Sequence, residues 1–177
     1  MILVYFDIDT QIDFLFPAGA LYVPGAEKLI PALSRLNRHA AASGSPLISS
    51  MCAHSEDDPE FRQWPPHCVL GTIGQLKPAE LLVEHQILFE KNQLDIFASP
   101  NLAPLLARLA ADRYVVYGVV TEYCVRLCAM GLLRLGKPVS IVADAIQTLD
   151  PAQSANTLRE FTNAGGLLTT VEEVCAQ

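Results

Sequence analysis

Charged residues are scarce in this chain of 177 residues, and basic residues are the scarcest of them. The chain has 19 Asp and Glu against 12 Lys and Arg, and charged residues make up only 18% of it. No cluster of Lys and Arg offers the basic surface that nucleic acids bind, and the net charge of −7 disfavours anionic membranes. We therefore expect small molecules as partners, with no nucleic acid and no membrane.

Disulfide frameworks, membrane spans and targeting segments are also missing from the pattern. Five cysteines, an odd number without regular spacing, argue against a disulfide framework and predict a reducing, cytoplasmic location. The longest apolar region, near 114–135, is interrupted by Glu122 and Arg126 and is not a membrane span. The first nine residues are short and have no basic leader, so we expect a strand there rather than a secretory signal.

What the chain does contain is a hydrophobic share of 51%, enough for one compact domain over residues 1–177. Short apolar runs alternate with helical patterns. Strands are expected near 1–8, 46–51, 85–91, 113–120, 138–143 and 166–171, and helices near 25–43, 77–84, 100–112, 124–136 and 151–164. This alternation predicts an α/β protein: a single-domain, three-layer αβα fold with a central, mostly parallel sheet of about six strands.

Cys124 follows a buried strand at the point where a helix begins. The run 114–120 is β-branched and apolar, as in a strand covered on both faces, and residues 124–135 have helical spacing. A sulfur in the first turn of a helix lies near unpaired N–H groups and the positive end of the dipole, which favour a thiolate. Cys124 is therefore a candidate nucleophile, with an inert buried cysteine as the alternative interpretation.

Two further chemical groups are expected at the same edge of the sheet. Asp9 ends the first predicted strand, Lys91 ends the third, and Cys124 follows the fourth. In an open parallel sheet, ligands bind beyond the carboxyl ends of the strands, so these three side chains should meet there. Each alone also fits a structural role, and Asp7 and Asp13 compete with Asp9 for the acidic position.

Four motifs in order carry a resemblance to a known family. They are the Asp-x-Gln-x-Asp-Phe pattern at 9–14, the Trp-Pro-Pro-His-Cys run at 64–68 followed by Gly-Thr at 71–72, the strand ending at Lys91, and the segment 118–124. Together they resemble the isochorismatase-like cysteine hydrolases, the nicotinamidases in particular. The resemblance implies a catalytic triad of Asp9, Lys91 and Cys124. It also implies an oxyanion hole of the Val120 and Cys124 N–H groups, with a cis peptide at Val119–Val120.

The resemblance further implies a function and a substrate pocket. The activity would be cysteine amidohydrolase chemistry on a carbon–nitrogen bond other than a peptide bond, through a thioester and with release of ammonia. The most favoured reaction is nicotinamide to nicotinate. The pyridine ring would stack between Phe14 and Trp64, although either aromatic could be an ordinary hydrophobic contact.

Many members of the family bind a divalent metal, and this chain departs from their ligand pattern. His54 and His67 are retained, but Cys52 stands where an aspartate is expected and Glu60 where a histidine is expected. Asp57 and Asp58 lie close by and could substitute as ligands. Cys52, His54, Glu60 and His67 would still form a reasonable zinc set, softer than the usual one. The alternative is a site that has lost its metal. Members are commonly homo-oligomers, and this chain is expected to allow the same.

Two alternative functions stay open at this point. The same triad could cleave another small amide, of the maleamate, ureidoacrylate or carbamoyl type. Less favoured is a thiol redox or binding protein that uses Cys124 with Cys128, which lies one helical turn further on. A redox cysteine has no need of both Asp9 and Lys91, so hydrolysis is the preferred interpretation.

Overall fold

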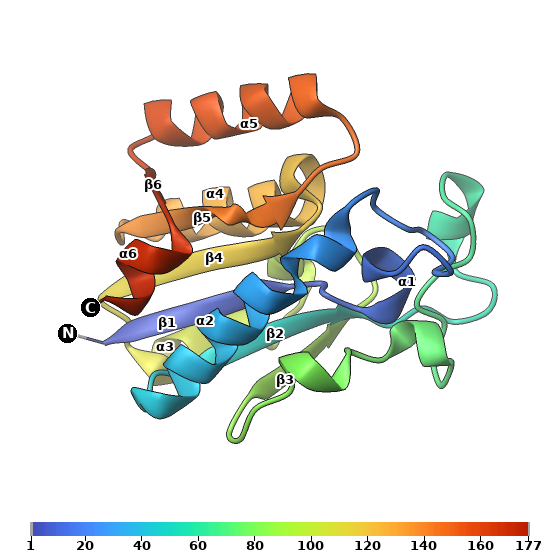
Figure 1. The fold of residues 1–177 in the computed structure, drawn as a ribbon, viewed down its shortest axis with the longest axis horizontal. Coiled ribbons are helices and arrows are strands. Elements are labelled where there is room, and N and C mark those ends of the chain that lie inside the picture. Colours follow the sequence, from blue (N-terminus) through green and yellow to red (C-terminus); the bar gives the residue numbers. More distant parts are fainter. Residues whose placement is uncertain (1, 177) are drawn as a thin grey trace.

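A six-stranded parallel sheet runs through the centre of the computed structural model, which describes residues 2–176 (Figure 1). The strand order is β3-β2-β1-β4-β5-β6, and every pairing is parallel. The strands are β1 Leu3–Ile8, β2 Leu47–Cys52, β3 Ile87–Lys91, β4 Arg113–Val119, β5 Val139–Gln147 and β6 Leu167–Thr169. The prediction of a single-domain α/β fold with about six strands is confirmed.

Helices cover both faces of this sheet, because its central strands are apolar on both sides. In β1, Tyr5 packs into one core, and Val4 and Phe6 pack into the other. The first core lies under α2 (Ile30–Ala42) and α6 (Val171–Cys175). The second lies under α3 (Leu102–Leu109), α4 (Arg126–Leu133) and α5 (Pro151–Asn163). The layers are therefore αβα, as the alternating pattern predicts.

The prediction of a helix at 77–84 is wrong. This stretch contains only a 3₁₀ turn at Ala79–Leu81, preceded by Pro78 in an extended conformation. A helix in so short a segment would have few side chains to bury. The short helices α1 (Ile12–Leu15) and α6 were not predicted.

Helix starts differ from the predictions in two other places. The predicted helix 25–43 begins with a 3₁₀ turn at Ala26–Leu29 before α2. The predicted helix 124–136 is α4 preceded by a π-helical turn at Thr121–Val125, so the chain coils three residues before Cys124. Among residues 2–176, the structure contains no helix with both the length and the apolarity to cross a bilayer.

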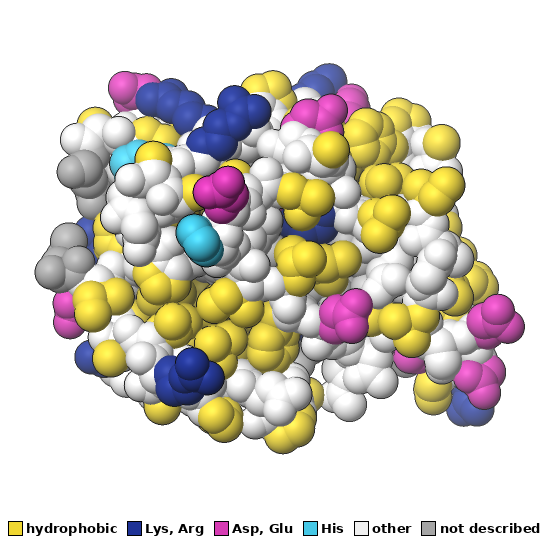
Figure 2. All heavy atoms as spheres, turned by 90° about the horizontal axis from the view of Figure 1, so that it is seen from below, with side chains coloured by type: hydrophobic (Ala, Val, Ile, Leu, Met, Phe, Trp, Pro, Cys, Tyr) yellow, Lys and Arg dark blue, Asp and Glu magenta, His cyan; other side chains and the backbone are white. Residues whose placement is uncertain are grey.

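The strand β3 forms an open edge of the sheet. Figure 2 views the molecule from below, and hydrophobic side chains cover much of that face, with few charged groups between them. Five exposed large hydrophobic residues come from the segment that leads into β3 or from the strand itself: Leu70, Ile73, Leu76, Leu82 and Leu88. Whether copies of the chain associate stays a prediction.

Candidate active site

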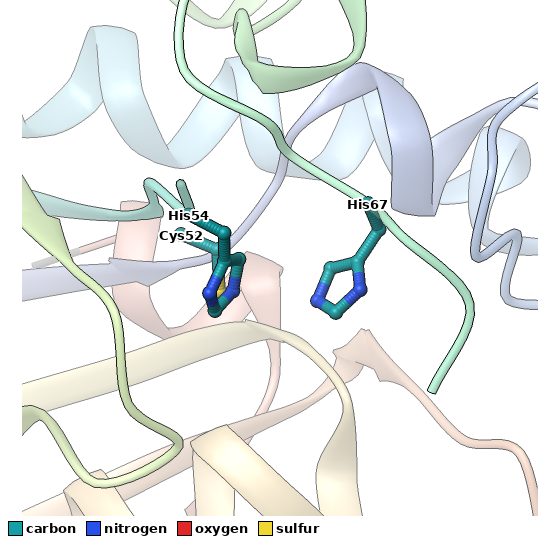
Figure 3. Close-up of side chains that lie close together, drawn as sticks. All are labelled: Cys52, His54 and His67. Carbon is teal, nitrogen blue, oxygen red and sulfur yellow. The ribbon is translucent and has the colours of Figure 1, made fainter. Parts of the chain in front are cut away.

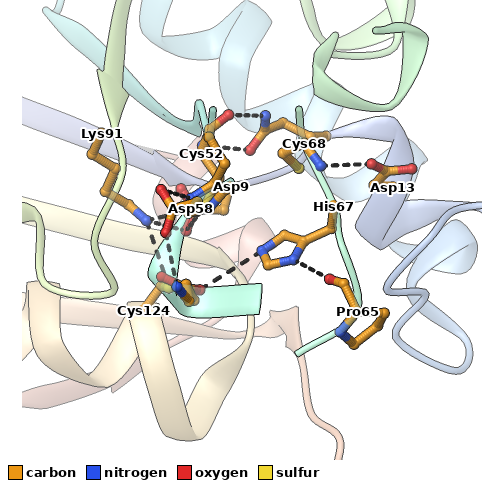
Figure 4. Close-up of polar contacts among 12 residues, drawn as sticks. Asp9, Asp13, Cys52, Asp58, Pro65, His67, Cys68, Lys91 and Cys124 are labelled. Carbon is orange, nitrogen blue, oxygen red and sulfur yellow. Dashed lines mark hydrogen bonds and ion pairs between the residues drawn. The ribbon is translucent and has the colours of Figure 1, made fainter. Parts of the chain in front are cut away.

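Three strand ends bring Asp9, Lys91 and Cys124 together, as predicted. Asp9 follows β1, Lys91 is the last residue of β3, and Cys124 lies in the turn after β4. The Lys91 ammonium is 2.8 Å from Asp9 Oδ2 and 3.8 Å from Cys124 Sγ (Figure 4). All three residues are buried, so water screens their mutual interactions weakly.

The Asp9 carboxylate is held in its ionised form. The Ser50 hydroxyl donates to Oδ1 at 2.6 Å, while Lys91 binds Oδ2. Burial alone would raise the pKa of Asp9, but the Lys91 charge and the hydrogen bonds from Lys91, Ser50 and Cys124 outweigh it, so the pKa lies below the usual value. Asp9 is therefore a carboxylate that can accept a proton.

The pKa of the Cys124 thiol is shifted in the opposite direction, upward. Burial raises the pKa of Cys124 well above its usual value, and the charge of Asp9 adds to this, although the Lys91 charge opposes it. The place of Cys124 at the start of a helix favours a thiolate, and burial acts in the opposite direction. A proton must leave the thiol when Cys124 reacts, and the neighbouring Asp9 carboxylate, whose pKa is lowered, can accept it.

The backbone before Cys124 has an unusual conformation. The peptide bond Val119–Val120 is cis, as the resemblance implies. Gly118 has φ +117°, and a Cβ at this position would lie 2.2 Å from the Ile8 carbonyl oxygen of β1. Only glycine permits this close approach. Val120 and Cys124 then line one pocket, and Cys124 lies in the π-helical turn in which the Tyr123 and Val125 N–H groups both donate to the Val120 carbonyl.

The pocket beside Cys124 is narrow and mostly apolar. Phe14 and Trp64 both line it, as predicted. Sequence reasoning did not identify Tyr123, whose ring lies 5.5 Å from that of Trp64, because an aromatic residue at the start of a helix has no distinctive signal. The other lining residues are Asp9, Leu21, Val23, Cys52, Glu60, His67, Leu94, Val119, Val120, Cys124 and Leu149.

Acidic but no Lys or Arg side chains line this pocket in the described part of the chain. Asp9 and Glu60 line it, and neither Lys nor Arg belongs to the described residues that do so. The nearby Lys91 is already engaged with Asp9. A ligand with its own carboxylate would therefore meet negative groups without a free cation to pair with.

A group of metal-ligating side chains opens onto the same pocket. Donor atoms of Cys52, His54 and His67 all lie within 4.8 Å of one another, and the three residues are buried (Figure 3). His54 Nε2 is a buried polar atom without a hydrogen-bond partner. Leaving such an atom unpaired costs about 1–3 kcal/mol, which a bound ion would remove. The three residues therefore fit a divalent metal.

Both imidazoles are oriented for metal binding by partners behind them. The Asp58 carboxylate lies 3.0 Å from His54 Nδ1, and the Pro65 carbonyl lies 2.8 Å from His67 Nδ1. Because these oxygens only accept, each Nδ1 carries a proton, and Nε2 is the nitrogen left to bind an ion. Burial also lowers the pKa of His67, which favours the neutral ring. Asp58, considered as a ligand from the sequence, instead supports His54.

The predicted fourth ligand, Glu60, lies beside the cluster but not within it. Its Oε1 is 3.7 Å from His67 Nε2, and its side chain is 15% exposed. The group whose donor atoms converge is limited, among the described residues, to Cys52, His54 and His67. Glu60 is thus near enough to approach an ion but is not preset as a ligand.

Cys52 also touches the triad, which sequence reasoning missed. Its Sγ is 3.3 Å from Lys91 Nζ and 3.7 Å from Asp9 Oδ2. The register of the sheet explains this, because Cys52 of β2 pairs directly with Lys91 of β3. The Gln11 side chain holds the backbone of Cys52 in place. Its Nε2 donates to the Cys52 carbonyl, and its Oε1 accepts a hydrogen bond from the Cys52 N–H. Burial raises the pKa of Cys52 to about 12, with the Asp9 charge adding to the shift.

Cys128 has no part in this pocket. It is fully buried in the core beneath α4, among residues such as Val125 and Leu132. The side chain therefore behaves as a small apolar residue. This observation argues against a redox pair of Cys124 and Cys128.

The chain is similar to proteins of one known family. The isochorismatase domain model matches residues 3–173. The nicotinamidase of Escherichia coli is 26% identical, over 94% of this chain and 93% of the relative. The pyrazinamidase of Pyrococcus horikoshii, solved in complex with zinc, is 29% identical with a TM-score of 0.89, over 95% of this chain and 98% of that one. The N-carbamoylsarcosine amidase of Thermoplasma acidophilum is 25% identical with a TM-score of 0.85, over 97% of both chains.

Proposed function

This chain belongs to the isochorismatase family, and we propose that it is a cysteine amidohydrolase that releases ammonia from a small, neutral heteroaromatic amide, nicotinamide first among them. One observation carries the proposal. A buried ammonium, Lys91, lies between a carboxylate and a thiol, 2.8 Å from Asp9 and 3.8 Å from Cys124. Structural packing alone does not require such a trio at the mouth of an apolar pocket.

In the first step, Asp9 accepts the proton of the Cys124 thiol while the sulfur attacks the amide carbonyl carbon. Asp9 suits this role because its lowered pKa keeps it available as a carboxylate. The carbonyl oxygen becomes an oxyanion. We assign the backbone N–H groups of Val120 and Cys124 as its donors, since both residues line the pocket.

In the second step, the proton on Asp9 passes to the amide nitrogen, the carbon–nitrogen bond breaks and ammonia leaves. The acyl group is then a thioester on Cys124. Asp9, again a carboxylate, accepts a proton from a water molecule that attacks the thioester, which releases the acid and returns the thiol. Lys91 only donates hydrogen bonds, so its part is to hold Asp9 in place and to balance negative charge as it develops on sulfur.

The pocket supports a neutral aromatic substrate. Phe14, Trp64 and Tyr123 line it, and a flat ring gains from burial against such faces. Asp9 and Glu60 disfavour an anionic substrate, since no free Lys or Arg lines the described pocket to pair with it. In the pocket without a bound ion, these side chains favour nicotinamide-like amides over maleamate, ureidoacrylate or carbamoyl acids.

We further propose that Cys52, His54 and His67 hold a divalent metal, zinc by preference, with Glu60 near enough to join them. When bound, the ion would supply a Lewis acid to the pocket. The hydrogen bonds that hold the two imidazoles and the unpaired His54 Nε2 support this metal site.

We also propose that the whole chain, residues 1–177, acts as one domain in the cytoplasm, where its five free cysteines stay reduced.

A second candidate, hydrolysis of a carbamoyl-type amide, is favoured by the similarity to the N-carbamoylsarcosine amidase of Thermoplasma acidophilum. Measuring ammonia release from nicotinamide, pyrazinamide, maleamate and N-carbamoylsarcosine separates the two. We expect the highest kcat/KM for the two neutral ring amides. Preference for either acid would overturn the assigned substrate class.

The nucleophile is tested with the same assay. Cys124→Ala should abolish ammonia release, because no thioester can form. Cys128→Ala is the matched control: it removes a buried thiol four residues further on that lies outside the pocket, and it should retain turnover. Turnover in Cys124→Ala, or equal loss in both variants, would contradict the proposal.

A further inference from the structure

The Cys52 sulfur belongs to two sets of residues at once. It is one of the three donor atoms that converge with those of His54 and His67 (Figure 3). It also accepts a hydrogen bond from Lys91 Nζ at 3.3 Å (Figure 4). No other described side chain combines a place in the metal cluster with a contact to the Lys91 ammonium.

The other two sulfurs near the pocket lie outside this arrangement. Cys124 Sγ contacts Lys91 at 3.8 Å but is not among the converging donor atoms. Cys68 Sγ is directed to the Gly74 carbonyl oxygen at 3.8 Å and is likewise outside the group. A metal in the cluster would therefore have a single sulfur ligand, supplied by Cys52.

A second observation points to a ligand at this position. His54 Nε2 is fully buried, carries a lone pair and has no partner. The Asp58 carboxylate behind the ring prevents it from turning to satisfy that atom elsewhere. The unpaired nitrogen and the Cys52 sulfur thus face the same point.

We propose that Cys52 binds the divalent metal as a thiolate and keeps its hydrogen bond from Lys91, so that one sulfur joins the metal centre to the triad. The inference rests on the proposed function only in taking the cluster as a metal site. Because thiolate is a soft ligand, the site should select zinc, cobalt(II) or cadmium over manganese or magnesium, which prefer oxygen ligands.

Binding involves no oxidation. The sulfur–hydrogen bond of Cys52 breaks as the metal–sulfur bond forms, and the proton leaves to solvent, so one proton is released for each ion bound. Lys91 keeps its hydrogen bond, since its ammonium donates to a lone pair of the Cys52 sulfur both before and after the metal binds. A hydroxyl or a carboxylate at this position could not reproduce the metal–sulfur bond.

Cobalt(II) provides a readout that does not depend on activity. We expect the full-length, metal-free protein to bind Co²⁺ with a near-ultraviolet sulfur-to-cobalt charge-transfer band. The band should be lost in Cys52→Ser and retained in Cys124→Ser, the matched control for the neighbouring thiol. Far-ultraviolet circular dichroism of each variant verifies that the fold is intact.

Persistence of the band in Cys52→Ser, its loss in Cys124→Ser, or no cobalt binding by the wild-type protein would overturn the inference. Competition supplies a second measure: Cys52→Asp should weaken Zn²⁺ binding relative to Mn²⁺ binding, and an unchanged ratio would also overturn it. If Cys52→Ser fails to fold, the ratio of Zn²⁺ affinity to Mn²⁺ affinity in Cys52→Asp tests the inference in its place. The charge-transfer band without any ammonia release would refute the amidase proposal alone, and ammonia release without the band would refute this inference alone.

Discussion

At the residue scale, Lys91 is the centre of the site. Its ammonium has three N–H donors and faces three acceptors: Asp9 Oδ2, Cys52 Sγ and Cys124 Sγ. Burial alone would lower the pKa of Lys91, but the charge of the Asp9 carboxylate and its hydrogen bond raise that pKa well above the usual value. Lys91 therefore stays protonated, and proton transfer falls to Asp9.

The pH dependence of the reaction should report Asp9. Its pKa is lowered, so the carboxylate needed as a base is present in the neutral range and is lost only as pH falls through that low value. Ser50→Ala removes the 2.6 Å hydrogen bond to Oδ1 and should move the acid limb of kcat/KM to higher pH, with little change at neutral pH.

Ser49→Ala is the control for this prediction, because Ser49 is on the same strand but donates to Asp7. The measurement is ammonia release against pH, with circular dichroism at each point to exclude acid unfolding. The stability due to Asp9 has the same sign: it is present above the unfolded pKa and is lost as pH falls through the folded one. An acid limb that moves equally in both variants would argue against Asp9 as the base.

At the element scale, the turn after β4 depends on Gly118. Its φ of +117° is unfavourable for other residues, and its Cα hydrogen faces the Ile8 carbonyl of β1. Gly118→Ala should separate β4 from β1, displace Val120 and Cys124, and destabilise the protein by at least about 2 kcal/mol. Urea unfolding and ammonia release measure the two effects.

Gly136→Ala is the matched control for Gly118→Ala. Gly136 also has a positive φ, of +73°, but a Cβ there meets no atom within 4 Å. Gly136→Ala should destabilise the protein only through backbone strain, by about 1 kcal/mol, and should retain turnover. Equal effects at the two glycines would show that the contact with Ile8 has no special importance.

Elements with strong periodicity were predictable, and those fixed by long-range contacts were not. The strands at 1–8 and 113–120 are apolar on both faces, which requires a covered sheet, and both form. Helix 77–84 does not form, because the tertiary contacts of the loop override a weak local pattern. The contact between Cys52 and Lys91 depends on β2 pairing with β3, which periodicity within either strand cannot reveal.

At the scale of the whole molecule, a second buried ion pair holds the long loop to the sheet. Lys77 Nζ lies 3.0 Å from Asp7 Oδ2, and both side chains are fully buried. Thr10 accepts from Lys77 and donates to Asp7. Lys77 closes the segment that carries His54 and His67, so this pair links the pocket wall to β1.

Lys77→Met should destabilise the protein by about 3–5 kcal/mol, because it leaves the Asp7 carboxylate buried without its counter-charge. Arg35→Ala, which breaks the exposed pair with Glu172, should cost less than about 1 kcal/mol. Urea unfolding of the two variants checks the contrast. Similar small losses in both would mean that the loop does not depend on the buried pair.

The central claim is that Cys124 carries the acyl group during turnover. It is tested most directly by mixing the protein with nicotinamide, quenching rapidly in acid and locating the adduct by mass spectrometry. We predict a nicotinoyl group on the peptide that contains Cys124, present in Cys128→Ala and absent in Cys124→Ala. An adduct on another residue, or ammonia release by Cys124→Ala at the wild-type rate, would contradict the account.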